Sequence, residues 1–196
     1  MEHSSHAVSA MIYLSIDVEA SGPFPGLHYL CSIGAAAVRT FDGVWQVDRD
    51  RTFYVELQPL EGADELPEAM RIHGLTRDHL AARGETPATA MAGLRSYLAS
   101  LGGPFRTAAW PISFDHPYVG WYLQRFGGDN PLGHSGLDIA SYAMGLFGKT
   151  SRRATFAAME AAGYRQPRND KPHDALHDAI EQGETLAWLL EHARAR

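Results

Sequence analysis

The chain of 196 residues is 45% hydrophobic, which is enough for one globular domain with a sizeable core and does not exclude two small ones. Its formal net charge is −6, whereas a protein that holds long duplex nucleic acid by charge alone is usually basic. No apolar run approaches the ~18 residues of a membrane span, and Cys31, the only cysteine, excludes an intrachain disulfide and a cysteine-based zinc cluster. Residues 1–10 lack the pattern of a secretory signal. We therefore expect a cytoplasmic protein with an irregular or disordered N-terminus.

The part of the sequence between residues 13 and 59 has patterns typical of strands. Apolar and polar residues alternate over residues 13–19, which predicts a strand that carries Asp17 and Glu19 on one face. The prolines and glycines of "GPFPG" end this strand. Second and third strands are predicted over residues 30–38 and 51–59. The short connections between the three favour antiparallel pairing.

From Leu66 onward the spacing of apolar residues becomes helical. Helices are predicted over residues 67–84 and 86–103, the second lying between a Thr-Pro start signal and a Gly-Gly stop signal. The remaining predicted elements are a strand over 105–114, a helix over 115–128, a short strand passing into a helix over 136–148, and helices over 152–164 and 173–193.

Four carboxylates lie near the ends of these elements: Asp17 and Glu19 on the first strand, Asp115 after the fourth, and Asp178 on the last helix. Burying ionised carboxylates costs free energy unless positive charge compensates them. Oxygen ligands favour hard cations such as Mg²⁺ or Mn²⁺, and two such ions about 3.5–4 Å apart can assist phosphodiester hydrolysis. The sequence therefore predicts a two-metal site, with Asp174 as a rival for the position of Asp178, because the two are one helical turn apart.

Three short motifs resemble those of the DEDDh 3′–5′ exonuclease family, namely "DVE" at 17–19, "FD" at 114–115 and "HDALHD" at 173–178. "IHGLT" at 72–76 resembles a further family marker. The resemblance spans residues 12–192 and implies an α/β, ribonuclease H-like fold, in which helices flank a mixed five-stranded sheet with three antiparallel strands first. Pro111 stands where many members of the family have asparagine, which leaves the sub-family open.

The resemblance implies a single exonuclease domain over residues 11–196 and a role for each motif residue. Asp17 would bridge two Mg²⁺ or Mn²⁺ ions, Glu19 and Asp178 would complete one metal site, and Asp115 would support the other. His173 would be the general base, a role that suits an imidazole. The turn residues Ala20, Ser21 and Gly22 would touch the terminal nucleotide. The implied reaction releases nucleoside 5′-monophosphates from the free 3′ end of single-stranded DNA or RNA, and homodimers are common in the family.

Residues 149–171 form a basic stretch with a net charge of +4, whereas the rest of the chain carries −10. This contrast predicts that Arg165 and Arg168 bind substrate phosphates; the alternative is a solvated surface. Aromatic residues follow helical spacing between 114 and 126, which favours core packing over a platform for base stacking. They are Phe114, Tyr118, Trp121, Tyr122 and Phe126.

Two other functions fit parts of the pattern. Aspartyl-phosphate phosphatases also place acids after a first strand, but they use D-x-D, and this chain has Glu19 at the second position. A nucleic-acid-binding module that has lost catalysis would share the fold, although the intact set of five motif residues argues against it.

Overall fold

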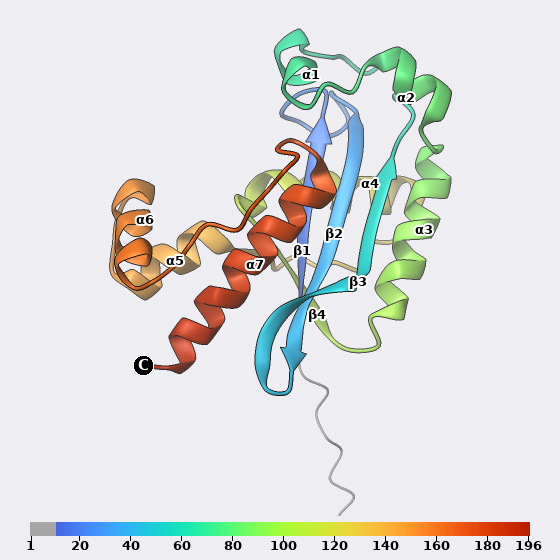
Figure 1. The fold of residues 1–196 in the computed structure, drawn as a ribbon. Helices are drawn as coiled ribbons and strands as arrows, with labels where there is room; N and C mark the ends of the chain where they lie inside the picture. Colours follow the sequence, from blue (N-terminus) through green and yellow to red (C-terminus); the bar gives the residue numbers. More distant parts are fainter. Residues whose placement is uncertain (1–10) are drawn as a thin grey trace, which may run out of the picture.

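The computed structural model describes residues 11–196, so the irregular end expected over residues 1–10 lies outside the described part of the chain. Five strands form one sheet in the order β3-β2-β1-β4-β5 (Figure 1). The strands are β1 (Ile12–Ala20), β2 (Leu30–Phe41), β3 (Val44–Glu56), β4 (Phe105–Ala109) and β5 (Leu137–Asp138). The first three pair antiparallel, and β1, β4 and β5 run parallel. The predicted mixed sheet is therefore confirmed.

β3 begins seven residues earlier than the sequence predicted. Asp42 and Gly43, both with positive φ, form a two-residue turn that joins β2 directly to β3. The charged residues that follow the turn obscured the strand pattern. One of them, Asp48, is nevertheless buried, and Arg39 and Arg51 lie 3.5 and 3.7 Å from its carboxylate.

The helices are α1 (Pro67–His73), α2 (Arg77–Arg83), α3 (Pro87–Ser100), α4 (Ile112–Phe126), α5 (Ile139–Phe147), α6 (Arg152–Ala161) and α7 (Ala175–Arg194). The single helix predicted over 67–84 is wrong: Gly74, with φ of 73°, ends α1, and the Thr76 side chain caps α2 by accepting a bond from the His79 N–H. α4 begins before Asp115, so that Phe114 and Asp115 lie in its first turn. Among residues 11–196, no helix combines the length and apolar character that crossing a membrane requires.

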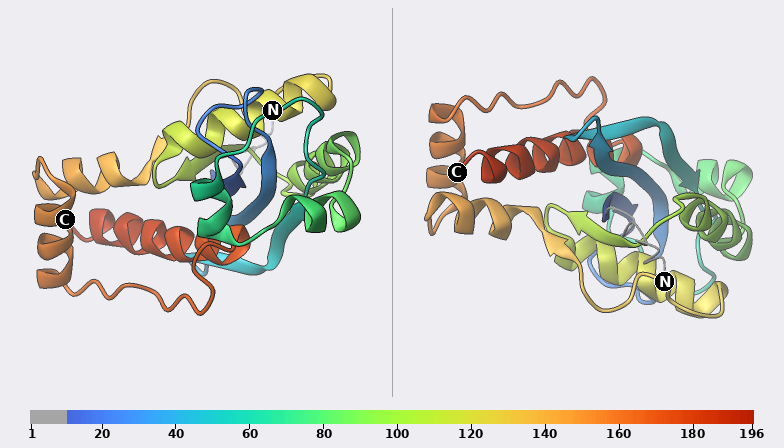
Figure 2. Two further views of the ribbon diagram at one scale, coloured as in Figure 1. Left: turned by 90° about the horizontal axis from the view of Figure 1, so that it is seen from above. Right: turned by 90° about the horizontal axis from the view of Figure 1, so that it is seen from below.

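Helices cover both faces of the sheet (Figure 2). α7 packs across β1, β2 and β3 on one face, while α3 and α4 enclose the main core with β1 and β2 on the other. The aromatic residues of α4 belong to this core, as the helical spacing predicted: Tyr118 and Tyr122 are fully buried, and the others pack around them. A second core joins β4, α5, α6 and α7.

α7 comes unusually close to the sheet at its first residue. A Cβ atom on Gly34 of β2 would overlap the backbone carbonyl of Ala175, so the absence of a side chain allows this approach. Gly34 is also the cross-strand partner of Asp17. The start of α7 is thereby seated beside the acidic end of β1.

Candidate active site

The ends of two neighbouring parallel strands position the first three acids. β1 and β4 run side by side; Asp17 and Glu19 lie near the end of β1, and α4, which follows β4, carries Asp115 in its first turn. The Asp115 carboxylate accepts a hydrogen bond from the Val18 N–H at 2.9 Å. This bond fixes the start of α4 to β1 between Asp17 and Glu19.

The first turn of α7 and the segment before it supply the remaining residues. Residues 162–174 run back alongside α7 to its first turn (Figure 2). There the backbone N–H of His173, a residue with φ of 65°, donates to the Asp178 carboxylate at 2.9 Å. Asn169 donates its side-chain amide to the other carboxylate oxygen of Asp178 and also to Glu181. Asp178 is therefore held from two points of the preceding segment.

The rival residue Asp174 has a different use. α7 begins at Ala175, two residues later than predicted, and Asp174 is its N-cap: the carboxylate accepts bonds from the N–H groups of Leu176 and His177 at 3.2 Å. The same carboxylate lies 2.8 Å from Nδ1 of His177. These contacts lower the pKa of Asp174 and direct its carboxylate to the helix end.

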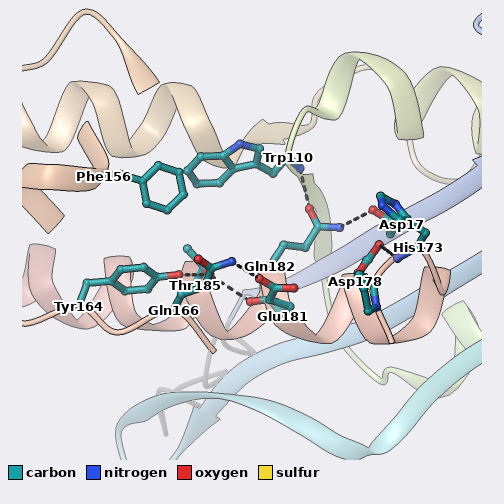
Figure 3. A pocket seen from close by; sticks show the side chains of 11 residues that line it. Asp17, Trp110, Phe156, Tyr164, Gln166, His173, Asp178, Glu181, Gln182 and Thr185 are labelled. Atoms are coloured by element: carbon teal, nitrogen blue, oxygen red, sulfur yellow. Dashed lines mark hydrogen bonds between the residues drawn. The ribbon is translucent and has the colours of Figure 1, made fainter. Parts of the chain in front are cut away.

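Glu19, His173 and Asp178 each offer a ligand atom, and these atoms all lie within 4.8 Å of one another. Asp17 lines the same cavity as His173 and Asp178, and the three side chains lie together at one end of it (Figure 3). Carboxylate oxygens suit hard divalent cations, and imidazole nitrogen suits several transition-metal ions. The donors gathered here therefore fit a divalent metal centre.

Burial and mutual repulsion disfavour the charged forms of these acids. Burial raises the pKa of Glu19 to about 8, and the charges of Asp178 and Asp115 add to this effect. Burial likewise raises the pKa of Asp115 to about 7. The pKa of Asp17 is raised well above its usual range by burial and by the charges of Asp115 and Glu19. A bound cation would reverse this penalty, which is further reason to regard the cluster as a metal site.

Gln182 completes the site, although it lies outside the sequence motifs. Its side-chain amide donates to the Ile16 carbonyl at 2.8 Å and to the Asp17 carboxylate at 3.4 Å, while its carbonyl accepts from the Trp110 N–H at 2.6 Å (Figure 3). It therefore ties β1 to the end of β4 directly behind Asp17. One signal was available, because Gln182 lies four residues after Asp178 and so on the same face of α7.

Comparison with known proteins agrees with this geometry. The model of the RNase T family, described as "Exonuclease", matches residues 14–186. The chain belongs to this exonuclease family. An Escherichia coli protein named 3′–5′ DNA exonuclease Cap18 is 34% identical to it over 181 residues, which cover 91% of each chain. The resemblance of the exonuclease to DEDDh 3′–5′ exonucleases is thereby confirmed.

Solved structures show the same fold at low sequence identity. The nuclease domain of 3′hExo, a DEDDh family member bound to rAMP, has a TM-score of 0.69 at 16% identity and covers 92% of both chains. Cell-death related nuclease 4 (CRN-4) has a TM-score of 0.69 at 13% identity over 92% of the exonuclease. E. coli exonuclease I in complex with single-stranded DNA has a TM-score of 0.70 at 17% identity over 95%. The exonuclease spans only 64% and 42% of the last two chains. The expected ribonuclease H-like architecture is confirmed.

The proline that replaces the family's usual asparagine leaves the exonuclease site assembled. Pro111 directly precedes α4 and makes no side-chain capping bond. Asp138, at the end of β5, instead accepts a bond from the Ile112 N–H at 3.1 Å, while its other oxygen caps α5. The start of α4, and hence Asp115, is secured by a residue from another strand.

Ala20, Ser21 and Gly22, which were expected to touch the terminal nucleotide of the substrate, differ in their surroundings. Ala20 and Gly22 line an apolar cavity of about 400 Å³ beside Glu19. Other residues on its wall are Leu66, Ile72, His73 and Phe114. Ser21 is fully buried: its hydroxyl donates to the Asp64 carbonyl and accepts from the Tyr29 N–H, each at 2.8 Å. Its hydroxyl is thus engaged in holding the turn, whereas Ala20 and Gly22 face the cavity.

The two arginines of the basic stretch lie outside the carboxylate cluster. Arg165 is exposed and donates to the Tyr164 carbonyl at 2.7 Å. Arg168, whose side chain is 87% exposed, pairs with Asp170 at 2.6 Å. Both belong to the segment that leads to His173. Their contact with substrate phosphates stays a prediction.

Proposed function

We propose that this exonuclease hydrolyses single-stranded DNA from a free 3′ end with two divalent metal ions, Mg²⁺ or Mn²⁺, and releases nucleoside 5′-monophosphates. One observation carries the proposal: four carboxylates and one histidine from three distant parts of the chain meet at the end of β1. We propose DNA rather than RNA as the substrate because the E. coli relative is named a 3′–5′ DNA exonuclease.

The proposal assigns a role to each residue of the cluster. Asp17 would bridge the two ions, Glu19 and Asp178 would hold one, and Asp115 would support the other. Bound ions would neutralise the carboxylates and stabilise charge on the attacking and leaving oxygens. The exposed position of His173 beside Glu19 and Asp178 supports its role as general base.

The proton and bond changes are simple. His173 would take a proton from the attacking water as the oxygen of that water forms a bond to phosphorus. The bond between phosphorus and the 3′ oxygen of the remaining strand would break. The 3′ oxygen of that strand would take a proton from solvent water to become a 3′ hydroxyl, and the terminal nucleotide would leave as a 5′-monophosphate.

The apolar cavity beside Glu19 supports action at a strand end. Its walls, which include Ala20, Gly22 and Phe114, would hold the terminal base. A base in this cavity would place its own phosphate near Glu19 and the other carboxylates. Cleavage would therefore remove one nucleotide at a time.

The assay uses a single DNA strand labelled at its 5′ end, with matched duplex and RNA substrates. Stepwise shortening with Mg²⁺ or Mn²⁺ and none in excess chelator is expected. Asp17→Asn should abolish the reaction, whereas the control Asp50→Asn, an exposed residue of β3, should not. Immediate mid-strand fragments would indicate an endonuclease, and strand binding without hydrolysis would indicate a silent binding module. Release of phosphate from simple phosphomonoesters would favour a phosphatase.

Cellular location and assembly belong to the same proposal. The single cysteine favours a reducing compartment such as the cytoplasm, and family precedent favours a homodimer. Cell fractionation and light scattering test the two points separately.

A further inference from the structure

A second cavity, of about 340 Å³, adjoins the carboxylates and has no lining residue in common with the apolar cavity beside Glu19. Asp17, His173 and Asp178 line one end of it, and three aromatic residues line the other (Figure 3). We call this far part the aromatic cleft and define it by Trp110, Phe156 and Tyr164. α7 forms the facing side. The cleft is therefore an extension of the catalytic cavity along α7.

The aromatic rings form a connected and well-fixed wall. The ring centroids of Trp110 and Phe156 are 5.4 Å apart, and those of Phe156 and Tyr164 are 6.4 Å apart. The Tyr164 hydroxyl lies 2.8 Å from the hydroxyl of Thr185 on α7, and Gln182 holds the backbone of Trp110. Trp110 and Phe156 are only partly buried. Their rings are thus available to a ligand without rearrangement of the wall.

The chemistry of the cleft favours a nucleobase over a phosphate. Glu181 lies on the α7 side, and Asp17 and Asp178 lie at the catalytic end, so a phosphate would be repelled from both. Aromatic rings bind bases of single strands by stacking, regardless of the base sequence. The exposed side chain of Gln166, whose amide donates to Glu181 at 2.8 Å, adds a neutral polar edge.

We infer that the aromatic cleft binds the second base from the 3′ end, on the uncleaved side of the scissile phosphate. The inference rests on the proposed function, because the strand must cross the carboxylates with its terminal base in the cavity beside Glu19. A strand held in this way would place the next base on the side of Asp17 and His173. Beyond the cleft, Tyr164 and Gln166 also line a surface hollow that includes Glu160 and Arg165. The Arg165 guanidinium would contact later phosphates there.

The experiment measures release of the first nucleotide under single-turnover conditions. The substrates are 5′-labelled DNA strands in which one base at a time, from the second to the sixth position from the 3′ end, is replaced by a stable abasic analogue. The wild-type exonuclease should lose about 5- to 100-fold in kcat/KM with the abasic analogue at the second position, and little at the sixth.

Phe156→Leu keeps an apolar side chain in the second core but removes the ring. In this variant the abasic penalty at the second position should fall below about 2-fold, because the stacking partner is gone. Phe156→Tyr should restore the penalty. Phe53→Leu, which alters an aromatic pair on β3 and α3, is the matched control and should keep the wild-type penalty.

The ratio between abasic and intact substrates does not depend on how active each variant is, and a thermal melt confirms folding. A wild-type enzyme that degrades the intact strand yet shows no penalty at the second position overturns the inference but not the proposed function. A penalty that survives Phe156→Leu unchanged also overturns it. Failure to degrade the intact strand would refute the proposed function itself.

Discussion

The backbone N–H of His173 donates to the carboxylate of Asp178, so the proposed general base and a proposed metal ligand share one contact. His173 has a positive φ and precedes α7, whereas Asp178 lies in the first turn of that helix. The contact involves only the backbone of His173, so it does not restrict the imidazole ring. Loss of the imidazole can therefore be separated from loss of the segment's position.

His173→Ala should reduce turnover by about 10²–10⁴-fold, the usual contribution of a positioned general base. The backbone bond to Asp178 remains possible in this variant, so Mn²⁺ affinity should be largely kept. The matched control His177→Ala removes a ring that contacts Asp174 and should change turnover little. Single-turnover hydrolysis and Mn²⁺ titration measure the two effects. A strong loss of Mn²⁺ affinity in His173→Ala would instead make the imidazole a metal ligand.

Without metal, the free energy of unfolding should fall as the pH rises from about 4.5 to about 8. Burial raises the pKa values of Glu19 and Asp115 to about 8 and 7, so the native state binds more protons than the unfolded state across this window. Denaturant unfolding in chelator measures the slope. Glu19→Gln removes one of the groups with a raised pKa and should make the slope shallower than in the wild type.

Metal binding should reverse this trend. Protons compete with the cation for the carboxylates, so Mn²⁺ should raise Tm more at about pH 8 than at about pH 5.5. Thermal melts with and without Mn²⁺ at the two pH values give the comparison. An equal rise in Tm at both would mean that the raised pKa values do not belong to the metal site.

Gln182→Met should weaken Mn²⁺ affinity or activity by about 10–100-fold, the usual cost of losing a group that orients a metal ligand. The variant removes the donor to Asp17 and the acceptor for the Trp110 N–H. Gln182→Glu keeps the acceptor but places a second carboxylate beside Asp17, so it should be at least as impaired as Gln182→Met. Gln124→Met, on an exposed amide of α4, is the control. Unchanged Mn²⁺ affinity and activity in Gln182→Met would show that Asp17 is oriented without Gln182.

The double substitution Arg165→Ala and Arg168→Ala should flatten the slope of log K against log salt by about 1 to 1.5 if both side chains touch phosphates of a single strand. Binding should weaken for all sequences alike, as measured by fluorescence anisotropy. The control removes the same charge elsewhere, at the exposed residues Arg106 and Arg125. If the two double variants have the same slope, the basic stretch is a solvated surface.

The sequence could predict the sheet and the acidic residues because both depend on local patterns. Alternation of residues identified β1, and short connections identified the antiparallel strands. The carboxylates were found because each lies in a short motif. Local patterns also misled: Gly74 was treated as a residue within a helix, although its positive φ ends α1, and Asp174 could not be recognised as the N-cap of α7.

Contacts between distant segments could not be predicted in this way. Gln182 bonds to the N–H of Trp110, 72 residues earlier in the chain, and no local pattern pairs the two. The same holds for the aromatic cleft, whose members come from the end of β4, from α6 and from the segment after it. Only the packing of α7 against these elements makes them neighbours.

Because α7 approaches Gly34 closely, this position affects the geometry of the proposed active site although it carries no reactive group. Any side chain there would have to push back the backbone of Ala175, and the first turn of α7 would carry Asp178 and the His173 segment away from β1. Gly34 has no group that can bind metal or substrate, yet a methyl group at this position would misalign residues that do. In a collection of random mutants, inactive alleles should therefore include changes at Gly34, in full-length protein whose catalytic side chains are all intact.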